Sequence, residues 1–268
     1  MTDSKLARLI ELLKDMESAV LAFSGGADSS FLLKTLHLSG IRALAVTADS
    51  ELTPRSDLLI AGNLAKDFGI EHRIIQTQEL ATEDFVRNTL ERCYICKKER
   101  CRILSDIASS GHYRFVLDGS NADDADDYRP GKRAAAEYHV RSPLEEAGFT
   151  KKEIRDLSRQ LGLSTWNKPS SPCLATRFPY GRRITGSALR RVAAAEAFLS
   201  TFGFSEIRVR DYGDMARIEV DADKIERLLT ADSRNLILET LRAMGYLFVS
   251  LDLEGYTSGS MNRVLRKE

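Results

Sequence analysis

The sequence lacks long apolar runs, an excess of either charge and a cysteine-rich framework. Its longest apolar runs, such as Ala19–Phe23 and Ala43–Val46, are far shorter than the roughly 20 residues that a membrane-spanning helix needs. The charged N-terminus has no apolar stretch of the signal-peptide kind. Lysine plus arginine equals aspartate plus glutamate at 39 each, which argues against a broad phosphate-binding surface for nucleic acid. We therefore expect a cytoplasmic protein without membrane or nucleic-acid partners.

There are only four cysteines in 268 residues, and in the cytoplasm they are thiols, metal ligands or catalytic groups rather than disulfides. The length suits two domains. Residues 167–186 contain three prolines and two glycines and interrupt the periodic pattern, so we predict a linker or loop there. The predicted organisation is a first domain over 1–166, this linker, a smaller domain over 187–255 and a polar tail over 256–268.

Strand and helix patterns alternate along the first domain. The predicted strands cover 18–23, 41–47, 71–75 and 114–117, and the predicted helices cover 5–16, 29–38, 55–68, a stretch over 82–108, and 151–161 behind a capping box at Thr150–Glu153. This alternation predicts an α/β fold, a doubly wound and mostly parallel sheet with helices on both faces. Ligands of such sheets bind beyond the carboxyl ends of the strands, where Ser24, Asp49 and Asp118 fall.

The second domain has an α+β pattern. Its predicted elements are a helix over 187–202, strands over 206–210, 215–220 and 247–251, and helices over 222–229 and 234–244. In the first two strands Arg208, Arg210, Arg217 and Glu219 alternate with apolar residues, so one face is ionic. Such a face is either a solvated surface or a bidentate grip on a phosphate, and the pattern leaves both open.

The segment Ser24–Ser29, with the sequence SGGADS, follows a buried strand and opens a helix. Backbone N–H groups and the positive helix end converge there, which suits an anion. Asp28 beside a polyphosphate would be repulsive unless Mg²⁺ lay between them. The absence of a following Gly-Lys-Ser/Thr excludes a Walker A loop. The alternative is a plain strand-to-helix turn capped by Asp28 or Ser29.

Two further loops carry chemistry. Asp118–Asp124, with the sequence DGSNADD, follows a later strand and is either an acidic turn or a second nucleotide segment. Cys173 lies in a loop where no periodicity enforces burial, close in sequence to Arg177. An accessible thiol near a cation is typical of a nucleophile, although an inert buried cysteine is the alternative.

The loop SGGADS resembles the signature of the PP-loop ATP pyrophosphatase superfamily. Together with the segments 92–97, 118–124 and 173–181, it is similar to the LarE-type sacrificial sulfur transferases, which act in nickel-pincer cofactor biosynthesis for lactate racemase. The resemblance spans the chain from the first strand to about Val220. It implies that ATP, with Mg²⁺, adenylates a carboxylate of pyridinium-3,5-dicarboxylate mononucleotide. A cysteine thiolate then displaces AMP, and C–S cleavage leaves a thiocarboxylate on the substrate and dehydroalanine in the protein.

The resemblance also implies roles for individual residues. Cys173 becomes the sulfur donor, and Arg177, Arg208 and Arg210 bind substrate phosphate. Glu196 and Glu219 become metal ligands, and a homo-oligomer, a hexamer, is implied. The ATP-binding residues so implied are Ser24, Gly25, Gly26, Asp28, Ser29, Asp118 and Asp123.

Cys93, Cys96 and Cys101 cannot easily meet at one ion on a regular helix, because Cys96 and Cys101 would point about 140° apart. Three alternatives stay open: structural thiols, a [4Fe-4S] cluster held by Cys93, Cys96 and Cys173, or a four-cysteine zinc site. Three alternative functions also stay open: a tRNA thiolase of the same superfamily, a carboxylate-amidating synthetase and a non-enzymatic nucleotide sensor.

Overall fold

The computed structural model describes residues 2–126, 130–169, 172–204 and 206–266. They form two compact units. Unit 1 comprises Met1–Glu79 and Leu90–Ser171, and unit 2 comprises Leu80–Thr89 and Pro172–Glu268. The division falls inside the predicted linker 167–186. The segment 80–89 belongs to unit 2, although its position in the sequence places it in the first predicted domain.

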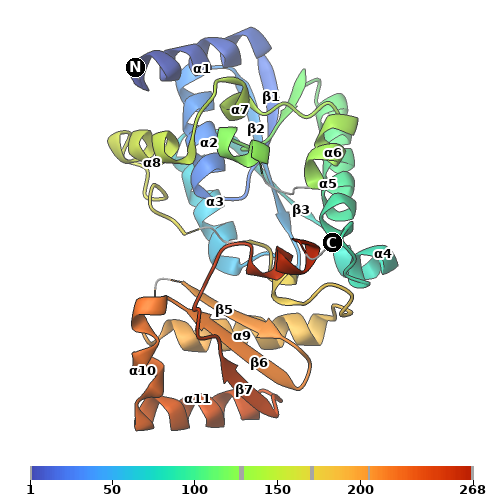
Figure 1. Ribbon diagram of the computed structural model, residues 1–268. Helices are drawn as coiled ribbons and strands as arrows, with labels where there is room; N and C mark the ends of the chain where they lie inside the picture. Colours follow the sequence, from blue (N-terminus) through green and yellow to red (C-terminus); the bar gives the residue numbers. More distant parts are fainter. Residues whose placement is uncertain (1, 127–129, 170–171, 205, 267–268) are drawn as a thin grey trace. The chain divides into compact units, whose positions relative to one another are not determined.

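Unit 1 is built on a parallel four-stranded sheet (Figure 1). The strands are β1 (Ser18–Ala22), β2 (Arg42–Asp49), β3 (Glu71–Gln76) and β4 (Phe115–Leu117), in the order β3-β2-β1-β4. Leu21 of β1 pairs with Leu117 of β4, so the loops that leave these two strands start side by side. The predicted α/β fold is confirmed, and its sheet brings the two candidate nucleotide segments to one edge.

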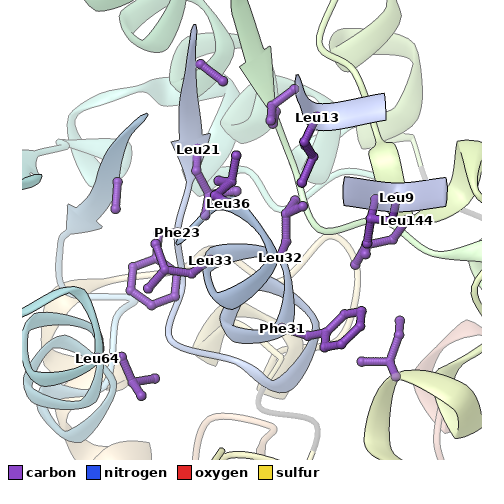
Figure 2. Close-up of a cluster of buried hydrophobic side chains, with 14 of the residues drawn as sticks. Leu9, Leu13, Leu21, Phe23, Phe31, Leu32, Leu33, Leu36, Leu64 and Leu144 are labelled. Atoms are coloured by element: carbon purple, nitrogen blue, oxygen red, sulfur yellow. The ribbon is translucent and has the colours of Figure 1, made fainter. Parts of the chain in front are cut away.

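Helices cover both faces of this sheet because successive strand residues point in opposite directions. Ala19 and Leu21 belong to a core with α1 (Thr2–Met16), α2 (Ala27–Ser39), α3 (Arg55–Asp67) and α8 (Lys151–Gln160). Val20 packs on the other face with α5 (Arg92–Ser110). Figure 2 shows the first core, in which Leu32, Leu33 and Leu36 of α2 gather near Leu21 and Phe23. This buried helix holds the phosphate loop at its N-terminal end.

The helix pattern of unit 1 differs from the prediction in two places. The stretch predicted over 82–108 is two helices, α4 (Glu83–Val86) and α5, because the chain breaks at Asn88, which has φ +55. The Asn88 side chain is buried and donates to the Pro179 carbonyl at 2.7 Å, a constraint that periodicity does not reveal. Helices α6 (Gly131–Glu137) and α7 (Pro143–Glu146), with the 3₁₀ turns η1 (Glu79–Ala81) and η2 (Ala122–Asp126), were not predicted. The capping box of Thr150 and Glu153 is confirmed.

Unit 2 contains a second sheet of three strands, β5 (Ile207–Asp211), β6 (Met215–Val220) and β7 (Phe248–Leu251). β5 and β6 are antiparallel, and β6 and β7 are parallel. Val209 and Ile218 face a core that includes residues of α9 (Gly186–Ser200), α10 (Glu226–Leu229) and α11 (Ala231–Ala243). The remaining turns are η3 (Leu174–Arg177), η4 (Ala222–Lys224) and η5 (Ser260–Arg266). The predicted small α+β module is confirmed.

The segment predicted as a polar tail contains the turn η5, which makes hydrogen bonds to other residues of unit 2. The Ser260 hydroxyl lies 3.3 Å from a guanidinium nitrogen of Arg210, and Asn262 accepts a hydrogen bond from the Tyr180 hydroxyl at 3.0 Å. None of the helices within the described ranges has the length and apolar character needed to cross a membrane.

Candidate functional site

The phosphate loop joins β1 to α2 and leaves N–H donors available for an anion. Gly26 is the N-cap of α2, yet its position provides no side-chain cap for the first N–H groups of the helix. Gly25 has φ +67, and a Cβ added there would lie 2.9 Å from the Asp57 carbonyl oxygen. The Ser24 and Ser29 hydroxyl oxygens are 3.1 Å apart. The predicted members of the loop therefore lie together at a helix N-terminus, where phosphate oxygens bind well.

The segment after β4 packs on the start of α2. A Cβ added at Gly119 would lie 3.1 Å from the Ser29 nitrogen, so a larger residue would press against the first turn of α2. Asp118, directly before it, accepts hydrogen bonds from the Ser142 hydroxyl at 2.7 Å and from the Ser120 N–H at 3.1 Å. Its neighbour Asp123 accepts the Lys151 N–H at 2.8 Å. The structure thus brings both predicted nucleotide segments to the same place.

Three lysines surround the loop, although the loop itself contains none. Lys151 Nζ lies 2.5 Å from Asp28 Oδ2, and Lys97 Nζ lies 2.7 Å from Asp118 Oδ2. Lys168 Nζ donates to the Gly25 carbonyl at 2.9 Å. None of the three is among the residues predicted from the sequence, although Lys97 directly follows Cys96 in a segment that carries the family resemblance. Each of these ammonium groups is paired with an aspartate, namely Lys151 with Asp28, Lys97 with Asp118 and Lys168 with Asp57.

Lys97 and Asp118 hold each other in their charged forms. Burial by itself lowers the pKa of Lys97 and raises the pKa of Asp118, but the opposite charge and the hydrogen bonds to the charged groups together outweigh burial in both cases. The pKa of Lys97 is therefore raised, and that of Asp118 is lowered. At neutral pH the carboxylate is available as an anionic ligand once its lysine moves to another partner.

The residues of unit 1 fit a magnesium ion that is shared with a nucleotide. Asp28 Oδ1 is buried and has no hydrogen-bond partner within the described part of the chain. A cation could therefore bind this oxygen without displacing a hydrogen bond. In that same part of the chain, no cluster of three or more His, Cys, Asp or Glu side chains is arranged to hold a metal. Mg²⁺ commonly binds one or two carboxylates and completes its coordination with phosphates and water.

In unit 2, Cys173 is exposed and forms the N-cap of η3. Its sulfur accepts a hydrogen bond from the Ala175 N–H at 3.4 Å. Arg177 closes the same turn with a bond of 3.0 Å to the Pro172 carbonyl and is itself 3% exposed. These two hydrogen bonds close the turn next to a sulfur that solvent reaches.

The ionic face of β5 and β6 is buried rather than solvated. Arg208 lies opposite Glu219, and Arg210 lies opposite Arg217. Arg210 is 4% exposed and donates twice to Glu219, which is fully buried. Arg208 stacks over the Tyr256 ring at 4.7 Å. Burial, followed by repulsion from the neighbouring Arg177, lowers the pKa of Arg208, so this face gathers positive charge at a cost in stability.

Glu196 and Glu219, which the family resemblance implies as metal ligands, both contact arginines. Glu196 accepts hydrogen bonds from Arg177 at 2.8 and 3.0 Å and from the Val209 N–H at 2.9 Å. Glu219 also accepts a hydrogen bond from Arg217 at 2.9 Å. In this arrangement both carboxylates serve as counter-ions that orient guanidinium groups.

The three cysteines of α5 differ in their surroundings. Cys93 is exposed, and Cys96 points its thiol at Glu79 Oε1 at 3.7 Å. Cys101 is 1% exposed, and burial raises the pKa of its thiol. A buried neutral thiol of this kind is a packing residue. Whether Cys93 and Cys96 bind a cluster stays a prediction.

The chain is 38% identical to a protein named pyridinium-3,5-bisthiocarboxylic acid mononucleotide synthase from Lactiplantibacillus plantarum, over 98% of this chain and 96% of the relative. It is 26% identical to a tRNA-specific 2-thiouridylase of Rickettsia massiliae over only 61% of this chain and 55% of that protein. No family model matches the sequence.

A solved structure of the NMN synthetase from Francisella tularensis has a TM-score of 0.51 with this chain at 20% identity. It covers 64% of this chain and 76% of the synthetase, so it supports the fold. The relative from Lactiplantibacillus plantarum is similar along nearly its full length. This chain therefore belongs to the family of the pyridinium-3,5-bisthiocarboxylic acid mononucleotide synthases.

Proposed function

We propose that this protein is an ATP-dependent sulfur transferase that converts a carboxylate of pyridinium-3,5-dicarboxylate mononucleotide into a thiocarboxylate with the sulfur of Cys173. The observation that carries the proposal is that Cys173 is exposed at the start of a hydrogen-bonded turn, in a chain that also has a phosphate loop without its own lysine. The first feature suits a nucleophile. The second suits a reaction in which ATP loses pyrophosphate rather than its γ-phosphoryl group.

In the first step, an oxygen of the substrate carboxylate attacks the α-phosphorus of ATP, and the bond to pyrophosphate breaks. The loop residues Ser24, Gly25, Gly26 and Ser29 bind the phosphates through N–H and hydroxyl donors. Lys97 and Lys151 neutralise the charge that develops on the departing pyrophosphate. Asp28, through its unpartnered Oδ1, would hold Mg²⁺, which when bound would screen the phosphate charge and orient the leaving group, while Asp118 and Asp123 belong to the nucleotide segment beside it.

In the second step, the Cys173 thiolate attacks the acyl carbon of the adenylate, and AMP leaves with the electron pair of the broken C–O bond. The Ala175 N–H points at the sulfur that approaches as an anion. Loss of the Cα proton of Cys173 to solvent then drives cleavage of its Cβ–S bond. The sulfur leaves on the substrate as a thiocarboxylate, and residue 173 becomes dehydroalanine.

The arginines of unit 2 supply a site for the substrate phosphate. Arg177 and Arg208 are buried close enough to repel one another, and a phosphate dianion between them would relieve that repulsion. Arg210 is more strongly engaged, because it also donates to the Thr176 carbonyl at 3.1 Å. We assign phosphate binding to Arg208 and Arg177 first and include Arg210 as the group that supports them. A metal role for Glu196 and Glu219 requires displacement of their arginines.

We further propose that the protein acts in the cytoplasm as a homo-oligomer, as the family resemblance implies. The alternative is a [4Fe-4S] cluster held by Cys93, Cys96 and Cys173. In that case the transferred sulfur would come from the cluster, and Cys173 would not be converted to dehydroalanine. A tRNA substrate is less well supported, because the formal net charge is zero and tRNA binding relies on clustered positive charge.

Mass spectrometry of the protein before and after turnover tests the proposal. With ATP and the dicarboxylate mononucleotide, wild-type protein should lose about 34 Da at Cys173, the mass of H₂S, as the thiol becomes dehydroalanine. Cys173→Ser should still release pyrophosphate but form no thiocarboxylate. Cys101→Ser should release pyrophosphate and also form thiocarboxylate. Normal product from Cys173→Ser would refute the donor role. Loss of product and of brown colour in Cys93→Ser or Cys96→Ser would instead support the cluster.

A further inference from the structure

Unit 2 contains a cavity to which the proposed reaction steps assign no role. Its volume is about 420 Å³, within the range of about 300 to 1,000 Å³ that small-molecule sites occupy. Its walls include two tyrosines, two arginines and one carboxylate, namely Tyr180, Tyr212, Arg217, Arg263 and Asp252. The cavity therefore offers aromatic surface and charges of both signs to a single ligand.

Arg217 lines this cavity with part of its guanidinium group uncommitted. Its Nη2 donates to Glu219 Oε1 at 2.9 Å and lies 3.8 Å from the Met261 sulfur. Its Nε lies 3.4 Å from Asp252 Oδ2 but makes no hydrogen bond within the described ranges. None of the hydrogen bonds that Arg217 makes within those ranges uses Nη1. Because the side chain is 28% exposed, a carboxylate from solvent can accept a hydrogen bond from Nη1 without displacing Glu219.

Tyr212 provides an aromatic wall next to this guanidinium group. The central carbon of the Arg217 guanidinium lies 5.4 Å from the centre of the Tyr212 ring, and the Tyr212 side chain is exposed. The Tyr212 N–H donates to the Met215 carbonyl at 2.9 Å, so the turn between β5 and β6 fixes where this side chain begins. The ring is thus available to a ligand without any rearrangement of the sheet.

The mixture of charges favours a zwitterionic ring over a simple anion. A phosphate or sulfate ion would gain nothing from the tyrosine rings and would be repelled by the Asp252 carboxylate. A pyridinium ring with carboxylate substituents suits all three kinds of wall. Its positive ring is attracted by tyrosine faces and by Asp252, and a carboxylate on the ring accepts charged hydrogen bonds from Arg217.

Arg210 connects the cavity to the turn that begins at Cys173. Its Nη2 lies 3.3 Å from the hydroxyl of Ser260, which lines the cavity. Its Nη1 donates to the carbonyl of Thr176, in the turn that Cys173 caps, at 3.1 Å. One guanidinium group thus contacts both structures, so within unit 2 the cavity lies beside the turn that carries the thiol.

We propose that this cavity binds the pyridinium ring of the substrate, and that Arg217 holds the carboxylate that is not being converted. Tyr212 contacts the ring, and the two residues together select a dicarboxylate over a pyridinium ring without carboxylates. This inference rests on the proposed function for the identity of the substrate. Binding of the ring itself requires neither ATP nor sulfur transfer.

The probe that tests the inference is N-methylpyridinium-3,5-dicarboxylate, which keeps the charged ring and both carboxylates but lacks the ribose and the phosphate. Saturation-transfer NMR titration of the full-length protein without ATP measures its affinity. Wild-type protein should bind this probe at least about 10-fold more tightly than N-methylnicotinamide, whose ring is equally charged but carries an uncharged amide.

Variants of the cavity should change this affinity in a graded way. Arg217→Met should weaken binding of the dicarboxylate at least about 10-fold, the effect of a lost charged hydrogen bond. Tyr212→Ala should weaken it at least about 3-fold, whereas Tyr212→Phe, which keeps the ring, should stay within about 2-fold of wild type. Arg227→Met, at an exposed position of α10, is the matched control and should bind as wild type does.

Circular dichroism establishes that each variant is folded, and Tyr212→Ala, which truncates an exposed side chain, keeps the test decisive if Arg217→Met unfolds. Three outcomes overturn the inference: no binding of the dicarboxylate to wild-type protein, no preference for it over N-methylnicotinamide, or wild-type affinity in either folded cavity variant. These outcomes would leave the sulfur transfer by Cys173 untouched. If the probe behaves as expected while Cys173→Ser still forms thiocarboxylate, the donor role fails and the ring site stands.

Discussion

Lys151 Nζ lies 2.5 Å from Oδ2 of Asp28, so the carboxylate of the phosphate loop is neutralised by a lysine from the first turn of α8. An acid at this position does not need a metal to be tolerated in the folded chain. The second oxygen, Oδ1, is buried and has no hydrogen-bond partner among the residues that the structure describes. Asp28 is therefore held in place by one oxygen and left open to a cation by the other.

We expect Asp28→Asn to fold normally and to lose pyrophosphate release at least about 100-fold, because an amide is a poor ligand for Mg²⁺ beside a polyphosphate. Calorimetric titration measures the affinity of the variant for Mg–ATP, and a pyrophosphate assay measures the rate of pyrophosphate release. Asp15→Asn, at an exposed position of α1, is the control. Wild-type turnover by Asp28→Asn would remove Asp28 from the metal site.

Gly25→Ala should impair the loop more than an ordinary glycine replacement. The left-handed φ costs an alanine about 1 kcal/mol, and its Cβ would also meet the Asp57 carbonyl oxygen at 2.9 Å. ATP affinity should fall at least about 10-fold. Gly69→Ala is a matched control, since Gly69 has φ +63 but nothing within 4 Å of an added Cβ. Gly69→Ala should lower the stability of the protein but leave its ATP affinity unchanged. An equal loss of ATP affinity in both variants would contradict a role for the close packing of Gly25 on Asp57.

The pair of Asp118 and Lys97 predicts a dependence of stability on pH. The pKa of Asp118 is lowered in the folded state, so its contribution is fully present above its unfolded pKa of about 3.9 and is lost as pH falls through the folded value. The pKa of Lys97 is raised, so its contribution is present below about pH 10.4 and is lost as pH rises through its folded value.

Asp118→Asn should therefore reduce the free energy of unfolding by about 1 to 3 kcal/mol at pH 7, less than for a fully buried pair because the Lys97 side chain is 31% exposed. Urea unfolding at pH 7 and at pH 3 should show that the difference from wild type shrinks in acid. A constant difference would mean that the ion pair does not provide the stability.

Arg208→Ala should weaken binding of the mononucleotide substrate by about 1.5 to 3 kcal/mol, the usual value for a charged hydrogen bond, while ATP binding changes little. Isothermal titration calorimetry with the mononucleotide and with ATP measures the two affinities separately. Arg183→Ala removes an exposed arginine that pairs with the exposed Glu83 and should alter neither affinity. A similar loss for both ligands in Arg208→Ala would contradict a substrate-phosphate site.

Much of the fold follows from local patterns. Apolar periods of two and of 3.6 residues place the strands and the long helices, and the SGGADS loop after a buried strand indicates the phosphate site. The exceptions are positions with no periodic signal. Asn88 breaks a predicted helix because its amide binds carbonyls about 90 residues further along the chain, a partner that no local pattern indicates.

The sequence by itself determined that Arg208, Arg210 and Glu219 share one face of two strands, because β side chains alternate with a fixed period. Only the tertiary structure decided that this face is buried, since exposure depends on what packs over it, here Tyr256 and Ser260 from the C-terminal segment. The same holds for the lysines of the phosphate loop. Lys97 contacts Asp118, 21 residues away, while Lys151 and Lys168 contact Asp28 and Gly25 across 123 and 143 residues. Contacts of charged side chains over such separations leave no mark on local periodicity.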